Sequence, residues 1–322
     1  MSFNVLIAYE SFSDSSVEGE ILQALDANIV QFGNFDTPEA LAAARQADAI
    51  MVTIQKIPAD LIASLERCRV ISRVGTGLDA IDIPAATARG IWVAYVPDYS
   101  VDEVSSHAVG LLLAHARGIP WLVESTRAGS WTHQVIAPRR RLRGQTLGLL
   151  GFGRIGQAVA AKARGLGLEI IVHDPFLDDQ VIAGGGARPV DRETLLRESD
   201  YLSLHVPLTD ANRRFLDAQA LALMKPTAFV INTARGGLVD EEALLNAVQS
   251  GQIAGAALDV LTVEPPAPDH PLLHEPRIII TPHTGWYSED ANHDVRVRAS
   301  EEVVRVLRGE RPRCPVNEII AR

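Results

Sequence analysis

The chain has 322 residues, of which 47% are hydrophobic and 22% are charged, a composition typical of a globular protein long enough for two domains. This composition excludes disordered and fibrous proteins. The formal net charge of −10 disfavours direct binding to nucleic acid, and we expect the one basic cluster, residues 139–143, to be a solvated or interface loop.

The cysteine content and the N-terminus indicate the compartment. Cys68 and Cys314 lie far apart and lack the CxxC spacing, so the sequence predicts neither a disulfide framework nor a metal site. No stretch approaches 18 uncharged apolar residues, and the N-terminus lacks a basic region followed by a long apolar core. We therefore expect a cytoplasmic protein with no membrane partner.

Short apolar runs alternate with helical patterns along the chain, which favours parallel sheets. A helix over 101–117, ended by Gly118 and Pro120, is a candidate interdomain hinge, and the tail 312–322 is expected to return to the first domain. The expected strands are 5–9, 49–53, 70–73, 91–95, 146–150, 168–173, 201–206, 228–232, 253–258 and 277–281. The other expected helices are 38–46, 58–68, 217–223, 241–250 and 288–308.

The segment Gly151-Phe152-Gly153-Arg154-Ile155-Gly156 follows an expected strand and opens a helical run, the context in which a glycine pattern indicates dinucleotide binding. Gly151 permits a tight turn, Gly153 lets the backbone approach a pyrophosphate, and Gly156 lets the helix pack on the strand. Asp174 ends the next strand, where an acid accepts the ribose hydroxyls. A strand-to-helix turn without a ligand is the alternative.

These patterns predict an α/β protein with two doubly wound parallel domains, Rossmann-like or flavodoxin-like, and a cleft between them. The expected limits are 1–98 with 287–322 for a discontinuous substrate domain, and 99–286 for an NAD-binding Rossmann domain.

Three ionisable residues, Arg235, Glu264 and His283, each follow an expected strand, where ligands bind to parallel sheets. Each alone could be an ordinary loop residue. Together they match hydride transfer to a carbonyl, because it needs a proton donor, a cation for the developing charge and a carboxylate that orients the histidine. His107, on the expected hinge helix, is interpreted as a packed helical histidine.

Five motifs between about residue 70 and residue 290 resemble the D-isomer-specific 2-hydroxyacid dehydrogenase family. They are SRVGTGLD at 72–79, the glycine motif with Asp174-Pro175, NTARGG at 232–237, ALDV at 257–260 leading to Glu264-Pro265, and Thr281-Pro282-His283. The stretches VPDYSV at 96–101, GWYSE at 285–289 and CPVN at 314–317 look most like the branch with the C-terminal-binding proteins, whose animal members are NAD(H)-dependent transcriptional corepressors.

The resemblance implies an NAD-dependent oxidoreductase that transfers hydride between NAD(H) and a 2-keto acid or D-2-hydroxy acid. It makes His283 the acid/base paired with Glu264, and Arg235 the anchor of the substrate carboxylate. The implied substrate-binding residues are Gly75, Thr76, Gly77, Arg235 and Trp286. The implied cofactor-binding residues are Thr76, Gly151, Gly153, Arg154, Ile155, Gly156, Asp174, Val206, Pro207, Asn212, Thr233, Ala234, Arg235, Asp259, His283 and Trp286.

Trp286 departs from the family pattern, which usually has an aliphatic or small residue there. It could pack on an apolar substrate side chain or anchor a core or interface, so the substrate stays open. A homodimer is the family expectation, through the arm 121–143. The rival function is an NAD(H)-sensing protein-binding module of the C-terminal-binding-protein type. Against it, the chain ends about where the dehydrogenase core ends, whereas the catalytic set does not decide between the two.

Overall fold

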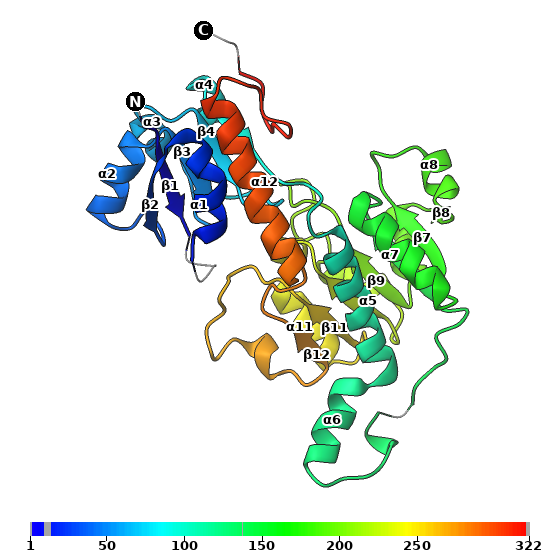
Figure 1. The fold of residues 1–322 in the computed structure, drawn as a ribbon. Coiled ribbons are helices and arrows are strands. Elements are labelled where there is room, and N and C mark those ends of the chain that lie inside the picture. The colour runs from blue at the N-terminus through cyan, green and yellow to red at the C-terminus, as the bar shows by residue number, and fades with distance from the viewer. Residues whose placement is uncertain (1, 10–13, 137, 320–322) are drawn as a thin grey trace. The chain divides into compact units, whose positions relative to one another are not determined.

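The computed structural model describes residues 2–9, 14–136 and 138–319, which form two compact units (Figure 1). Unit 1 comprises Met1–Tyr99 and Ser288–Arg322, and unit 2 comprises Ser100–Tyr287, with boundaries adjacent to the expected limits. Each unit is a parallel sheet with helices on both faces, so the predicted two-domain α/β fold is confirmed.

Unit 1 contains five parallel strands in the order β2-β1-β3-β4-β5. The strands are β1 (Asn4–Ala8), β2 (Asn28–Phe32), β3 (Ala49–Val52), β4 (Val70–Arg73) and β5 (Trp92–Ala94). The helices are α1 (Ser16–Leu22), α2 (Pro38–Gln46), α3 (Ala59–Ser64), α4 (Ile83–Ala88) and α12 (Glu289–Leu307), with a short 3-10 turn at Gln23–Leu25.

Alternation along the buried strands of unit 1 supplies two cores. Val5 and Ile7 face α1 and α12, whereas Leu6 and Ala8 face α2, α3 and α4. The tail returns to this sheet as expected: Pro315 forms an antiparallel bridge with Ala94, and Asn317 accepts the Val93 N–H at 2.8 Å. Residues 320–322 of the expected tail lie outside the described residues.

Unit 2 contains seven parallel strands in the order β12-β11-β10-β9-β6-β7-β8. The strands are β6 (Thr146–Leu150), β7 (Glu169–His173), β8 (Arg188–Pro189), β9 (Tyr201–Leu204), β10 (Phe229–Asn232), β11 (Gly255–Leu258) and β12 (Ile278–Ile280). The helices are α5 (Val101–Arg117), α6 (Ile119–Arg127), α7 (Arg154–Gly165), α8 (Asp179–Gly184), α9 (Arg192–Glu198), α10 (Ala218–Leu223) and α11 (Glu241–Gln249), with 3-10 turns at Gln134–Ile136, Gly236–Leu238 and Pro271–His274.

The strand order of unit 2 fixes where a ligand binds. The chain builds from β6 through β7 to β8 in one direction, and then continues from β9 on the other side of β6. This reversal is a topological switch point, outside which the carboxyl ends of parallel strands leave a crevice for a ligand. The glycine motif begins directly after β6, so it lies at the switch point.

Candidate active site

The glycine turn after β6 has the shape of a phosphate cradle. Gly151 has a φ of +90°, and a Cβ there would lie 2.7 Å from the carbonyl oxygen of His205. A Cβ at Gly156 would lie 2.4 Å from the Gly151 carbonyl oxygen, whereas one at Gly153 would meet nothing within 4 Å. Two glycines therefore serve close packing, and the third leaves open space beside the backbone.

Helix α7 begins directly after this open position, at Arg154. Its N-cap, Gly153, makes no side-chain capping bond, and the first N–H groups of a helix have no partner within the helix. The amides of Arg154 and Ile155 therefore face a site suited to an anion, and the helix dipole favours negative charge there. These residues fit the pyrophosphate of a dinucleotide.

Asp174, directly after β7, connects two parts of this site. Its Oδ2 accepts the N–H of Phe152 at 2.9 Å, and its Oδ1 accepts the N–H of Phe176 at 3.0 Å. A carboxylate has about four acceptor positions, so it can still accept hydroxyl donors while these two bonds fix it beside the glycine turn. This geometry fits the ribose of an adenosine.

The loop after β9 closes the other side of the glycine turn. Val206 packs there, since its Cγ1 would lie 2.6 Å from a Cβ at Gly151. Asn212 accepts the N–H of Thr209 at 2.7 Å and donates to the Pro207 carbonyl oxygen at 2.8 Å, which holds the loop in a compact turn.

The turn after β10 carries Arg235 and is fixed by Asn232. The buried side chain of Asn232 accepts the N–H of Ala234 at 3.0 Å and donates to the carbonyl oxygen of Arg235 at 2.8 Å. Among the described residues, the buried Oγ1 of Thr233 has no hydrogen-bond partner. A buried hydroxyl without a partner is costly unless a ligand satisfies it, so Thr233 fits the expected cofactor site.

Three strand-end loops meet in unit 2. A Cβ at Gly236 would lie 2.0 Å from the Leu261 carbonyl carbon, so only glycine allows this approach of the Arg235 turn to the loop after β11. Leu261 in turn donates its N–H to Glu264 Oε1 at 2.7 Å. Glu264 Oε2 lies 2.6 Å from His283 Nδ1. The structure therefore brings together the loops that carry Arg235, Glu264 and His283.

The Glu264–His283 pair is partly open to solvent, with the two side chains 35% and 41% exposed. Burial raises the pKa of the Glu264 carboxyl, but the hydrogen bond and charge of His283, together with the Leu261 N–H, outweigh burial and lower that pKa below its usual range. Glu264 is therefore a carboxylate at neutral pH and accepts from Nδ1, which leaves Nε2 of His283 to face a reactant.

Asp259 fixes the loop of His283. His283 donates its N–H to the Asp259 carbonyl oxygen at 2.8 Å, and the next two amides, of Thr284 and Gly285, donate to its Oδ1 at 3.0 Å and its Oδ2 at 2.8 Å. The family resemblance assigns Asp259 to the nicotinamide end of the cofactor. Its carboxylate is 3% exposed and is already engaged in positioning this loop.

Of the remaining expected substrate residues, three lie in unit 1, whereas Trp286 lies in unit 2. Gly75, Thr76 and Gly77 follow β4, and the Gly75 N–H donates to the Arg73 carbonyl oxygen at 2.9 Å, which leaves the amides of Thr76 and Gly77 as better candidates for an anion. The half-buried Trp286 packs edge-to-face with Tyr287, with ring centroids 5.5 Å apart.

Sequence reasoning missed the supporting residues of this site. Asn232 and Gly236 belong to the recognised NTARGG motif, but their roles depend on a turn and a close approach that appear only after folding. Within residues 2–9, 14–136 and 138–319, no three His, Cys, Asp or Glu side chains are grouped to hold a metal ion. No helix in this described part is long and apolar enough to span a membrane.

Comparison with known proteins agrees with this geometry. Residues 109–285 match the family model described as D-isomer specific 2-hydroxyacid dehydrogenase, NAD binding domain. D-3-phosphoglycerate dehydrogenase from Methanocaldococcus jannaschii is 41% identical over 87% of this chain and 53% of its own length, so the chain spans about half the length of such curated relatives. Hydroxypyruvate reductase from Thermotoga maritima is 38% identical over 81% of this chain and 85% of its own length.

A solved structure extends the similarity to the whole fold. The structure of D-lactate dehydrogenase from Aquifex aeolicus, complexed with NAD and lactic acid, has a TM-score of 0.87 and 26% identity, covering 95% of this chain and 96% of that chain. These relatives do not single out the branch of the C-terminal-binding proteins, so that finer placement stays a prediction. The chain belongs to the D-isomer-specific 2-hydroxyacid dehydrogenase family, and residues 109–285 form its NAD-binding domain.

Proposed function

We propose that this protein is an NAD-dependent oxidoreductase that transfers hydride between NAD(H) and a 2-keto acid or the corresponding D-2-hydroxy acid. The observation that carries the proposal is the 2.6 Å contact between Glu264 and His283, joined through Leu261 and Gly236 to the turn of Arg235. This arrangement lies in the same unit as a glycine turn that fits a dinucleotide.

In reduction, NADH held by the amides of Arg154 and Ile155 and by Asp174 would supply the hydride for the new C–H bond at the carbonyl carbon. Arg235 binds the substrate carboxylate with its planar guanidinium and polarises the keto oxygen, on which negative charge develops. His283, held through Nδ1 by Glu264, donates the Nε2 proton to that oxygen and becomes neutral imidazole. Oxidation of the hydroxy acid runs the same proton transfer in reverse.

A panel of substrates tests this function. The names of the relatives suggest hydroxypyruvate for reduction, and D-3-phosphoglycerate and D-lactate for oxidation. We expect turnover of at least one 2-keto acid with NADH to a product of D configuration. Tight NADH binding without turnover of any 2-keto acid would instead favour the rival NAD(H)-sensing module.

Coenzyme choice is predicted to depend on Asp174. Its carboxylate, fixed by the amides of Phe152 and Phe176, would accept the ribose hydroxyls and repel a 2′-phosphate, so NADH should bind more tightly than NADPH. Dissociation constants measured by fluorescence titration check this expectation. Asp174→Ala should narrow the preference, and equal binding of the two coenzymes by the wild-type protein would contradict the role of Asp174.

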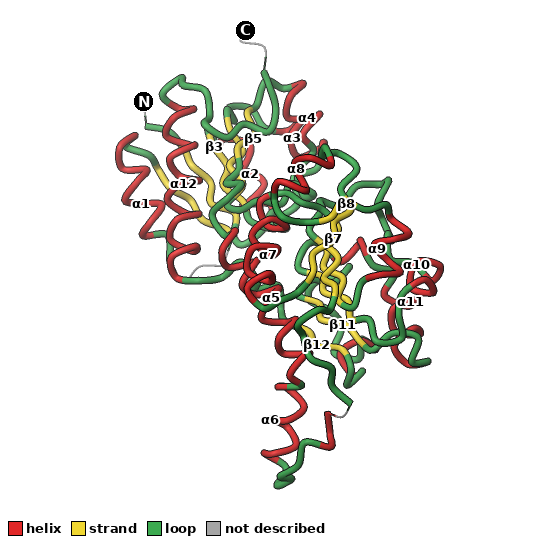
Figure 2. Tube along the Cα trace, turned by 90° about the vertical axis from the view of Figure 1, so that its right-hand side faces the viewer, coloured by secondary structure: helices red, strands yellow, loops and turns green. Residues whose placement is uncertain are grey.

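The arm after α5 is proposed to form a homodimer with a second copy of the chain. Figure 2 shows α6 extending away from the strands of unit 2. Helix α6 and the segment that follows it in the chain expose large apolar side chains: Val123 is 42% exposed, Val135 47% and Trp131 91%. Such residues grouped on one segment mark an interaction surface. Light scattering should find a dimer for the wild type and a monomer for Val123→Glu/Trp131→Glu, and a monomeric wild type would disprove the proposal.

A further inference from the structure

His107 on α5 contacts the loop that carries His283, although the sequence indicated only a packed helical histidine. Its Nε2 lies 3.0 Å from Thr281 Oγ1 and 3.4 Å from Asp259 Oδ1. Thr281 in turn donates its hydroxyl hydrogen to Asp259 Oδ1 at 2.5 Å. Because that hydroxyl has only one hydrogen, Nε2 of His107 must carry a hydrogen and donate to Thr281.

The loop needs such support because His283 has a φ of +54°, in the left-handed region. This conformation is unfavourable for a residue with a side chain and persists only where its surroundings fix it. The amides of His283, Thr284 and Gly285 are all held by Asp259. The orientation of the His283 imidazole therefore depends on the orientation of Asp259.

Packing and charge place His107 behind Asp259. A Cβ at Gly285 would lie 2.8 Å from Asp259 Oδ2 and 3.3 Å from His107 Cδ2, so the histidine ring forms a wall against the loop. Burial raises the pKa of Asp259, but hydrogen bonds from His107, Thr281 and two amides outweigh burial and lower that pKa. Asp259 is therefore a buried carboxylate whose orientation depends on these donors.

We propose that His107 is a positioning residue for His283. His107 acts through Thr281 and Asp259 to fix the loop 281–285. The alternative is that His107 only packs α5 on the sheet. The proposal rests on the proposed function in one respect, because the position of His283 affects a rate only if His283 transfers the proton.

His107→Leu removes the donor, whereas His107→Gln keeps an N–H donor on a side chain of similar reach. We expect His107→Leu to lower kcat for keto-acid reduction on the order of tenfold to a hundredfold, the scale of misplacing a catalytic group. The KM for the keto acid should stay nearly unchanged, since Arg235 holds that substrate. His107→Gln should recover most of kcat. Thr281→Val, which breaks the next bond, should lower kcat similarly, and the double variant His107→Leu/Thr281→Val should lose little more.

His115→Leu is the matched control. His115 also lies on α5 and is buried, but its ring stacks on that of Phe229, with ring centroids 3.7 Å apart. Its Nε2 lies 3.2 Å from Nη1 of Arg139 and not against the His283 loop. The His115→Leu substitution should lower the melting temperature without changing kcat. An equal loss of kcat in His115→Leu would show that helix packing alone is responsible and would overturn the proposal.

A second readout needs no substrate. The imidazole NMR signal of His283, identified by its loss in His283→Ala, should shift or broaden in His107→Leu and stay at its wild-type position in His107→Gln and His115→Leu. An unchanged His283 signal in folded His107→Leu would disprove the positioning role even if the enzyme is active. A shifted signal in a protein that turns over no 2-keto acid would support the positioning role and disprove the proposed function alone.

Discussion

Arg235→Lys is expected to lower kcat/KM for 2-keto acid reduction by at least about a hundredfold, nearly as much as Arg235→Ala. The side chain of Asn232 fixes the turn that carries Arg235. A planar guanidinium on this turn can hold a carboxylate with two parallel bonds and also reach the keto oxygen, whereas a lysine ammonium is a point charge without that fork.

Steady-state kinetics with the best keto acid of the panel measure this effect, and NADH affinity should barely change. Arg197→Lys is the matched control, because Arg197 lies exposed on α9 and pairs with Glu193 of the same helix at 2.8 Å. Near-normal turnover by Arg235→Lys would show that Arg235 does not bind the reacting group.

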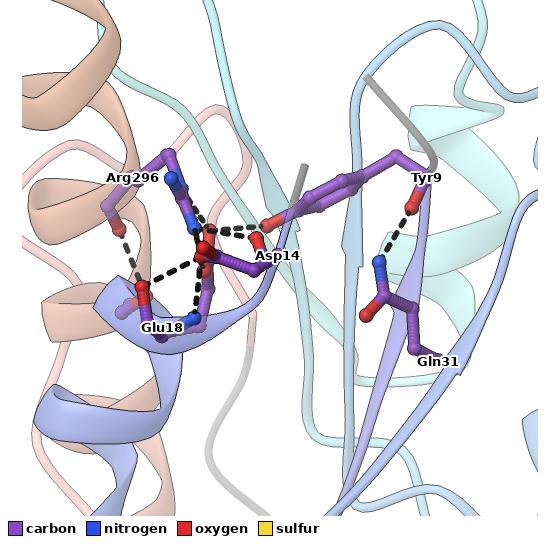
Figure 3. Close-up of polar contacts among 7 residues, drawn as sticks. Tyr9, Asp14, Glu18, Gln31 and Arg296 are labelled. Atoms are coloured by element: carbon purple, nitrogen blue, oxygen red, sulfur yellow. Dashed lines mark hydrogen bonds and ion pairs between the residues drawn. The ribbon is translucent and has the colours of Figure 1, made fainter. Parts of the chain in front are cut away.

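Arg296→Met is expected to lower the free energy of unfolding by about 3–5 kcal/mol, the cost of leaving a buried charge without its partner. Figure 3 shows that Arg296 on α12 points toward Glu18 on α1, and it donates to both Glu18 oxygens, at 2.7 and 2.6 Å. Glu18 is 0% exposed. Tyr9 also donates to Glu18 at 2.8 Å, and burial together with Glu18 raises the pKa of Tyr9, so its hydroxyl stays protonated. The substitution leaves the Glu18 carboxylate without its cation.

Arg298→Met gives the comparison on the same helix. Arg298 pairs with Asp98 at 2.6 Å, but the two side chains are 39% and 45% exposed, so its loss should cost less than about 1 kcal/mol. Urea unfolding followed by circular dichroism measures both variants. Equal stabilities of the two variants would show that the buried pair contributes no more than the surface pair.

The strands that the sequence predicted are those with continuous apolar runs. β3 and β10 are buried at every position, and a run of four mostly apolar residues is recognisable from the order of the amino acids alone. β2 (Asn28–Phe32) was missed because it is a half-exposed edge strand, and β8 was missed because it has only two residues, one of them a proline. The sequence also does not predict helix α6, since Gly118 and Pro120 indicate the end of α5, whereas Pro120 also lies in the first turn of α6.

In the site too, positions that depend on local sequence patterns were predictable, whereas contacts formed by folding were not. It was predictable that the loops of Arg235, Glu264 and His283 lie together, because each residue follows a strand and parallel strands end at one edge. The contacts that orient them were not predictable. Asp259 holds three successive amides, and His107 reaches the loop through a residue 174 positions away, Thr281, so no spacing rule within the sequence identifies them.

The central claim is that the Glu264 carboxylate favours the protonated form of His283, the form that reduction needs. The pKa of Glu264 is lowered, so its negative charge is present at neutral pH, 2.6 Å from Nδ1 of His283. Glu264→Gln keeps a hydrogen-bonding side chain but removes that charge, so the imidazolium of His283 loses its counter-charge. His283→Ala should remove most of the activity at every pH.

The most direct measurement is the pH dependence of kcat/KM for keto-acid reduction in the wild type and in Glu264→Gln, with deuterated NADH used to establish that hydride transfer limits the rate. Reduction should fall with rising pH in both proteins, and the fall in Glu264→Gln should come at lower pH. The rate of oxidation, which needs neutral imidazole, should rise over the same pH range. If hydride transfer limits the rate in both proteins and the two reductive profiles coincide, Glu264 does not control the protonation of His283 and the account is contradicted.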